Sequence, residues 1–159
     1  MMFDTYLSVM IESLEKKDAL LSALEQKSME QTEMIKNPDS LLADIDHNMD
    51  EKAELIDELT KIDTGFEALY SDIKEGLNEH KDEYKEQIKT IQNLIGDVMA
   101  KSASVQAIEA RNKTEMEKRF AAEKKELQQR KNVSKVAYDY YATSNKIDLY
   151  TPQFMDKKK

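Results

Sequence analysis

Two histidines and their acidic neighbours are the side chains in this sequence with the clearest potential for chemistry. Asp44 precedes His47 by three residues and Glu51 follows it by four, so on a helix these carboxylates share a face with the imidazole. A di-iron centre in a helical bundle needs an acidic residue three positions before a histidine on each of two helices. His80 has Leu77 at that position, so the second half of such a centre is missing. We interpret both histidines as exposed residues on charged faces and expect no metal or other cofactor.

Other catalytic patterns are absent from the sequence. There is no Cys, which excludes disulfides, thiolate catalysis and zinc–thiolate sites. Neither a G-x-S-x-G pattern nor a phosphate-binding loop occurs, and the chain has only three glycines. We predict a protein that is not an enzyme. A metal-binding or enzymatic helical bundle is the most distant alternative.

The composition favours a single all-α domain. Charged residues make up 35% of the 159 residues, whereas the chain has only 3 Gly and 2 Pro, too few for the turns of a β fold. No apolar run approaches the roughly 18–20 residues of a membrane span. The first residues also lack a basic leader before their apolar positions. We therefore expect a cytoplasmic protein that does not insert into membranes.

Acidic and basic residues are unevenly distributed. The net charge is −8, but residues 101–159 carry 14 Lys and Arg against 8 Asp and Glu. A basic third can indicate nucleic-acid binding. These residues lack interleaved Gly, stacking aromatics and a known binding motif, so we expect no nucleic-acid partner. We interpret the basic excess as a solvated face or as a surface packed beside the acidic helices.

Apolar residues spaced by three and four predict a first helix from about Phe3 to Ile35. Lys17, Ser28 and Gln31 occupy the remaining positions of its seam. A short connection should then make the next helix antiparallel to it, so that the two form a hairpin.

A second helix is predicted from Asn37, which can cap it, with Pro38 in its first turn. Its seam is interrupted by Asn48 and Lys52, and its end is open between Gly65 and Gly76. The apolar seam positions are Leu41, Ile45, Leu55, Leu59, Ile62, Phe66, Leu69 and Ile73.

A third helix is predicted from His80 or Lys81 to Arg130, about 75 Å long. Its stripe begins at Tyr84, includes Ile108 and narrows at its far end to Met116, Phe120 and Leu127. Because its partners are about 50 Å long, this end should overhang them and need a partner, a dimer mate or a folded-back tail to cover it. The oligomeric state stays open, and a dimer is one possibility.

The C-terminal segment, residues 132–159, differs from the predicted bundle domain of residues 1–131. Ser, Asn, Thr and Pro argue against regular structure from Thr143 onward, so we predict an irregular tail. The segment is rich in aromatics, which suggest docking onto the bundle or binding to a partner. They are Tyr138, Tyr140, Tyr141, Tyr150 and Phe154. The overall prediction is an all-α, elongated antiparallel bundle of three long helices, coiled-coil-like, with this tail.

Three stretches resemble the FlgN-type flagellar export chaperones. MDEKAELIDELTKID, residues 49–63, is similar to the family's Glu/Leu-rich second helix. SVQAIEARNKTEMEKRF, residues 104–120, resembles its last long helix, in which an Asn follows an apolar and acidic run. PQFMDKKK, residues 152–159, follows a Tyr-rich run and resembles the Phe-x-Asp-Lys-Lys ending of several members.

The resemblance implies a cytoplasmic chaperone that binds hook–filament junction subunits, shields their terminal helices and delivers them to the flagellar type III export apparatus. It also implies that the C-terminal part binds the client and that a tyrosine there contacts the export gate. Tyr138, Tyr140 and Tyr141 are the candidates by position.

The thin stripe and the tail aromatics together form the expected partner-binding set. A client helix would lie on the stripe, and the aromatics would anchor it. Its members are Met116, Phe120, Leu127, Tyr138, Tyr140, Tyr141, Tyr150 and Phe154. Alternatively, the tail covers the stripe in the free protein. The alternative function is a structural coiled-coil or spectrin-like scaffold with partners along its sides.

Overall fold

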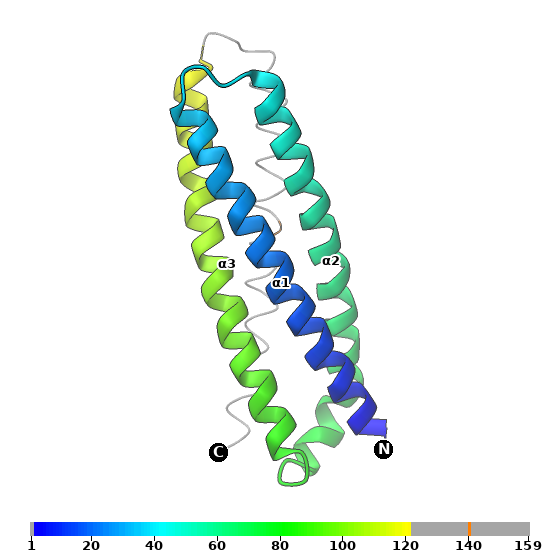
Figure 1. Ribbon diagram of the computed structural model, residues 1–159. Helices are drawn as coiled ribbons and strands as arrows, with labels where there is room; N and C mark the ends of the chain where they lie inside the picture. Colours follow the sequence, from blue (N-terminus) through cyan, green and yellow to red (C-terminus); the bar gives the residue numbers. More distant parts are fainter. Residues whose placement is uncertain (1, 122–139, 141–159) are drawn as a thin grey trace.

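Three long helices joined by short loops make up the fold (Figure 1). The computed structural model describes residues 2–121 and residue 140. Helix α1 spans Met2–Lys36, α2 spans Leu42–Glu79 and α3 spans Lys85–Arg119. There is no strand among the described residues. The predicted all-α bundle of three long helices is confirmed. The predicted boundary between residues 131 and 132 lies outside the described residues.

Helix α1 is the shared neighbour of the other two helices. It packs against both α2 and α3, whereas within these described helices no Cα atom of α2 lies within 8 Å of a Cα atom of α3. In Figure 1, α1 accordingly runs across the bundle between the other two helices. Ion pairs join Lys17 to Asp63 and Lys27 to Glu51, so the numbering of α1 and α2 runs in opposite directions. This arrangement confirms the predicted antiparallel hairpin.

The seam of α1 is buried as the sequence predicts. Its polar members are buried as deeply as its apolar ones, with Lys17 3%, Ser28 0% and Gln31 1% exposed. The apolar members that are buried are Leu7, Met10, Leu14, Leu21, Leu24 and Ile35. Because α1 has a neighbour on two sides, this seam is covered along the length of the helix except at Phe3, which is partly buried.

The buried stripe of α2 is rotated from the predicted seam. Ile45, Leu59 and Ile73 are buried as expected, but Leu41 is 64% exposed. Four predicted seam residues are only partly buried and form what we call the α2 shoulder: Leu55, Ile62, Phe66 and Leu69. The stripe instead includes Met49, Ile56, Asp63 and Leu77. Buried stripe and shoulder together form an apolar face wider than contact with α1 alone requires.

The predicted start of the second helix at Asn37 is wrong by several residues. Asn37 belongs to the loop, where its side-chain oxygen accepts a hydrogen bond from the backbone N–H of Asp39 at 3.0 Å. Helix α2 begins at Leu42, and its N-cap residue Leu41 makes no side-chain capping bond. The Asn-Pro pair therefore forms a turn between the two helices instead of starting the second one.

The two glycines considered as ends of the second helix both lie within α2, which continues to Glu79. Gly65 has no neighbouring atom within 4 Å of the position a Cβ would take. At Gly76 such a Cβ would overlap the Phe3 ring, which also contacts the rings of His80 and Tyr84. Gly76 thus allows the start of α1 to approach the end of α2 closely.

Helix α3 is shorter than predicted. It begins at Lys85, after a turn through residues 80–84, and ends at Arg119 instead of Arg130. With 35 residues it is about 52 Å long and matches α1, so the predicted overhang is wrong. Ile108, predicted in its stripe, is only partly buried, whereas Ser102 and Asn112 are buried.

The buried apolar residues form two clusters. The terminal cluster consists of Ile35, Ile45, Met49, Met116 and Phe120, where α1 ends, α2 begins and α3 ends. The central core is the larger cluster, which takes residues from all three helices and also contains Tyr140.

Alanine substitutions at the glycines test how closely α1 approaches α2. Gly65→Ala should raise the free energy of unfolding by up to about 1 kcal/mol, because alanine is the better helix former and the site is open. Gly76→Ala should instead lower the free energy of unfolding, because its methyl group displaces Phe3. Urea denaturation of both variants is the measurement. Gly96→Ala, at an open site in α3, is the control and should behave like Gly65→Ala. A stabilised Gly76→Ala would contradict the close packing at Phe3.

Candidate functional site

The two histidines lie apart and face solvent. The His47 side chain is 77% exposed, with its Nε2 3.5 Å from Glu51. The His80 side chain is 47% exposed beside Glu83, at the other end of α2. Among residues 2–121 and 140, no three His, Asp or Glu side chains are grouped so that they could hold a metal ion. The predicted exposure of both histidines is confirmed.

Met116 and Phe120, predicted on an uncovered stripe, are buried. They are 3% and 6% exposed and pack in the terminal cluster against Ile35 of α1 and against Ile45 and Met49 of α2. The expectation of an under-covered stripe is therefore wrong for these two residues, because the start of α2 and the end of α1 cover them. Sequence periodicity placed them on a buried face correctly but could not identify the neighbours that bury it.

Among the expected tail aromatics, Tyr140 is the one that the structure describes. It is helical, 6% exposed and part of the central core. The remaining expected partner-binding residues lie outside the described residues: Leu127, Tyr138, Tyr141, Tyr150 and Phe154. Tyr140 thus lies inside the bundle and not on its surface.

Arg119 ties the end of α3 to the end of α1. Its guanidinium donates hydrogen bonds to carbonyl oxygens in the last turn of α1 and in the following loop, at 2.8 to 3.4 Å. The acceptors are Met34, Ile35, Asn37, Pro38 and Ser40. A cation also suits the negative end of the α1 dipole. No sequence pattern indicated this contact, because the carbonyls of α1 lie more than 80 positions earlier in the chain.

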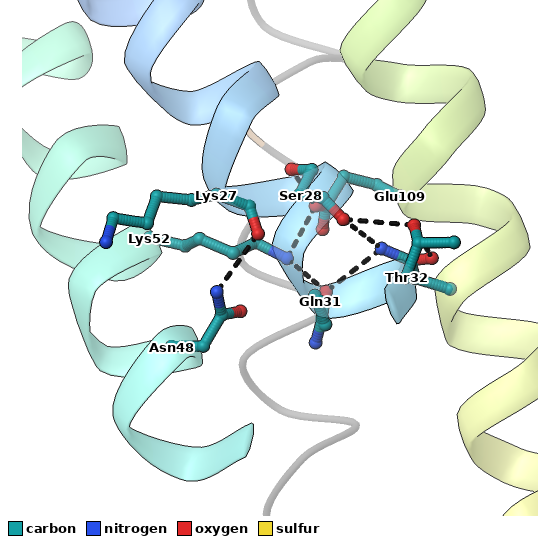
Figure 2. A network of polar contacts seen from close by, with 8 residues as sticks. Lys27, Ser28, Gln31, Thr32, Asn48, Lys52 and Glu109 are labelled. Carbon is teal, nitrogen blue, oxygen red and sulfur yellow. Dashed lines mark hydrogen bonds and ion pairs between the residues drawn. The ribbon is translucent and has the colours of Figure 1, made fainter. Parts of the chain in front are cut away.

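A buried layer of polar side chains crosses the bundle below the terminal cluster (Figure 2). Lys52 of α2 donates to Gln31 Oε1 of α1 at 2.5 Å and pairs with Glu109 of α3 at 2.5 Å. Asn112 of α3 donates to Gln31 Oε1 at 3.2 Å and to the Ser28 carbonyl at 2.9 Å. We call these five residues the polar layer.

Neighbouring side chains extend the polar layer on both sides. Thr32 donates to Asn112 Oδ1 at 2.7 Å, and Ser28 donates to Glu109 at 2.5 Å. On the α2 side, Asn48 donates to the Lys27 carbonyl at 3.0 Å. Apart from Thr32, the sequence pattern identified the α1 and α2 side chains of this network as polar seam positions, but it missed both members on α3. Continuing the three-four spacing from position 105 leads to positions 109 and 112, so the information was present.

The electrostatics of the polar layer are dominated by burial of Lys52. Its side chain is 4% exposed, and this desolvation lowers its pKa, while Glu109 acts in the opposite direction by favouring the ammonium form. A lysine with a lowered pKa can act as a base or nucleophile where a substrate can reach it. Here the amine is enclosed by Gln31 and Glu109, so the arrangement orders the helices.

A second polar level lies two heptads nearer the N-terminus of α1. Lys17 pairs with Asp63 of α2 at 2.7 Å, with side-chain exposures of 4% and 7%. The next residue, Asp18, pairs with Lys101 of α3 at 2.8 Å. Two adjacent residues of α1 therefore bind different helices, one α2 and the other α3. Each ion pair fixes the position of that helix along the axis of α1.

An open cleft of about 420 Å³ lies beside the polar layer, between the ends of α1 and α3. Thr32 and Asn112 contribute to it from the polar layer side, and Lys36, Lys118 and Arg119 give it a basic rim. Arg119 already donates hydrogen bonds to the loop carbonyls, and the Lys118 ammonium group lies 3.4 Å from the Glu115 carboxylate. Both cations therefore already have partners within the protein.

Comparison of the chain with protein-family models, with curated proteins and with solved structures gave no match. None of the three described helices is long and apolar enough to cross a membrane.

Replacing Arg119 tests the tie between α3 and α1. Arg119→Ala should lower the free energy of unfolding by about 2 kcal/mol, because the carbonyls lose charge-assisted hydrogen bonds. Arg119→Lys should recover only part of this loss, because an ammonium group cannot span the same acceptors. The adjacent Lys118→Ala is the control, since that side chain is 70% exposed, and it should change stability by less than about 0.5 kcal/mol. If Arg119→Ala and Lys118→Ala changed the free energy of unfolding equally in urea denaturation, the Arg119 hydrogen bonds would contribute nothing to stability.

Replacing Lys52 tests the polar layer. Lys52→Met should lower the free energy of unfolding by about 3 kcal/mol, because it leaves the Glu109 carboxylate buried without its cation. Adding Glu109→Gln should restore most of the loss, because the remaining layer is then neutral. Lys61→Met, at a side chain that is 75% exposed, is the surface control. A double variant less stable than Lys52→Met, measured by chemical denaturation, would contradict this pairing.

Proposed function

We propose that this chain is a FlgN-type export chaperone, a non-enzymatic cytoplasmic bundle that binds the terminal helices of hook–filament junction subunits and delivers them to the flagellar type III export apparatus. The observation that carries the proposal is the position of Tyr140. This residue from beyond the three helices lies in their central core, so the core accepts an aromatic side chain that none of the three helices supplies.

The packing of the three helices supports a helix-in-groove mode of binding. The backbones of α2 and α3 both lie close to α1 but not to each other, so each helix retains a flank that α1 does not cover. The α2 shoulder is partly exposed, and its Leu55, Phe66 and Leu69 also pack against the central core. A client's amphipathic helix recognises such a surface through apolar residues at i, i+3, i+4 and i+7.

Two of the three stretches that carry the family resemblance lie among the described residues, and the third, residues 152–159, lies outside them. Residues 49–63 form the middle of α2 and include Lys52 and part of the α2 shoulder. Residues 104–120 form the end of α3, and their Asn112 lies in the polar layer. Both stretches therefore help to form the bundle on which we propose that the client binds.

A structural scaffold is the second candidate function. It is favoured by the two buried polar levels, because polar seam residues specify register in coiled coils that only need to hold their shape. A scaffold would bind partners along its exposed sides. Its partner binding should therefore depend on the α2 shoulder no more than on other exposed apolar side chains.

Client capture tests the proposed function. The full chain should form a stable complex with a purified hook–filament junction subunit from the same genome, measured by calorimetry. Phe66→Ser on the α2 shoulder should weaken this complex by about tenfold or more, because a buried aromatic anchor contributes strongly to a helix-binding groove. Met99→Ser is the matched control, since Met99 is 42% exposed on α3, and should leave affinity unchanged. No complex with any junction subunit would reject the proposal, and equal losses at both positions would favour the scaffold.

A further inference from the structure

The terminal cluster and the central core are separate apolar units within the described residues. They share no buried residue, and the partly buried apolar residues that pack against one do not pack against the other. The terminal cluster is the smaller of the two, so its burial supplies the smaller part of the hydrophobic stabilisation. The end of the bundle is therefore held together less strongly than its middle.

Each helix interrupts its buried apolar stripe at the level of the polar layer, where side chains such as Lys52 and Asn112 take the buried positions. The interruptions lie between Leu24 and Ile35 on α1, between Met49 and Ile56 on α2, and between Val105 and Met116 on α3. Water can hydrogen-bond to the groups of this layer but not to apolar side chains. An opening that begins at the terminal cluster can therefore stop at the polar layer without exposing the central core.

Among the described residues, hydrogen bonds and packing hold the end of α3 against the other two helices. Arg119 donates to the carbonyls of Met34 and Ile35 at 2.8 Å. At the opposite end of the bundle, the loop of residues 80–84 joins α2 to α3 covalently. When the Arg119 hydrogen bonds break, the end of α3 is the part that separates, because residues 37–41 still join α1 to α2.

We propose that the end of α3 is a latched opening unit. It separates from α1 and α2 as far as the polar layer while the central core stays closed, and Arg119 is the latch. Local openings of this kind require less free energy than global unfolding. The opening exposes a methionine-rich surface, because it parts Met116 of α3 from Met49 of α2. This device follows from the packing of the chain alone and does not depend on the proposed function.

Methionine oxidation of the full natural chain tests the opening, because methionines lie in both clusters and on the surface. Hydrogen peroxide transfers one oxygen atom to the thioether sulfur and leaves water. Met29 and Met99, 51% and 42% exposed, should be oxidised first. Met10, 0% exposed in the central core, should be oxidised only through global unfolding. Met49 and Met116, 2% and 3% exposed, should be oxidised at least about tenfold faster than Met10.

Initial oxidation rates from peptide mapping by mass spectrometry are the measurement. Rates for Met49 and Met116 as slow as the rate for Met10 would overturn the separate opening. A second variant distinguishes local from global opening: Ile91→Val, in the central core, lowers overall stability without altering the terminal cluster. It should accelerate oxidation of Met10 only. Equal acceleration at all three methionines would show that the bundle opens as one unit and would overturn the proposal.

Replacing Arg119 tests the latch. Arg119→Ala should raise the initial oxidation rates of Met49 and Met116 by about tenfold or more, because the closed state loses its hydrogen bonds to α1. The adjacent Lys118→Ala is the control and should leave both rates unchanged, since that side chain is 70% exposed. Circular dichroism should show the same helical content in both variants. Equal oxidation rates in Arg119→Ala and Lys118→Ala would overturn the assignment of Arg119 as the latch.

Discussion

The burial of the Lys52 ammonium group is the constraint on which the arrangement of the three helices depends. An unpaired charge at this depth would cost several kcal/mol, so α1 and α3 must both bring an oxygen to it, from Gln31 and Glu109. Apolar side chains alone would tolerate a slip of one heptad more readily, because one leucine or isoleucine can replace another at a seam position. The second polar level, where Lys17 pairs with Asp63, makes the register of α1 and α2 unambiguous. Polar residues that weaken the hydrophobic seam locally thus determine how it is aligned.

Much of this architecture could be predicted from the spacing of apolar residues, because a helix must bury its stripe. The limits of α1 and the buried positions of Lys17, Ser28 and Gln31 follow from the three-four pattern. The end of α3 does not follow from this pattern, because RFAAEKK contains no helix breaker. The helix stops where Arg119 and Phe120 contact α1 and α2. The start of α2 was misplaced for a related reason, since the loop carbonyls are held by Arg119.

The candidate site was harder to predict than the fold. Apolar residues near the C-terminal end of α3 suggested an exposed stripe, but periodicity records only that a face is buried and not which segment buries it. Met116 and Phe120 are covered by α1 and α2, and Tyr140 is covered within the central core. An aromatic residue from outside a predicted bundle can therefore be part of its core.

Links at both ends of the bundle limit how far α2 and α3 can separate. At one end the loop of residues 80–84 joins these helices covalently, and at the other Arg119 binds α3 to the loop from which α2 begins. Neither end can spread freely. A change that separates α2 from α3 must therefore break the Arg119 hydrogen bonds or strain the loop of residues 80–84.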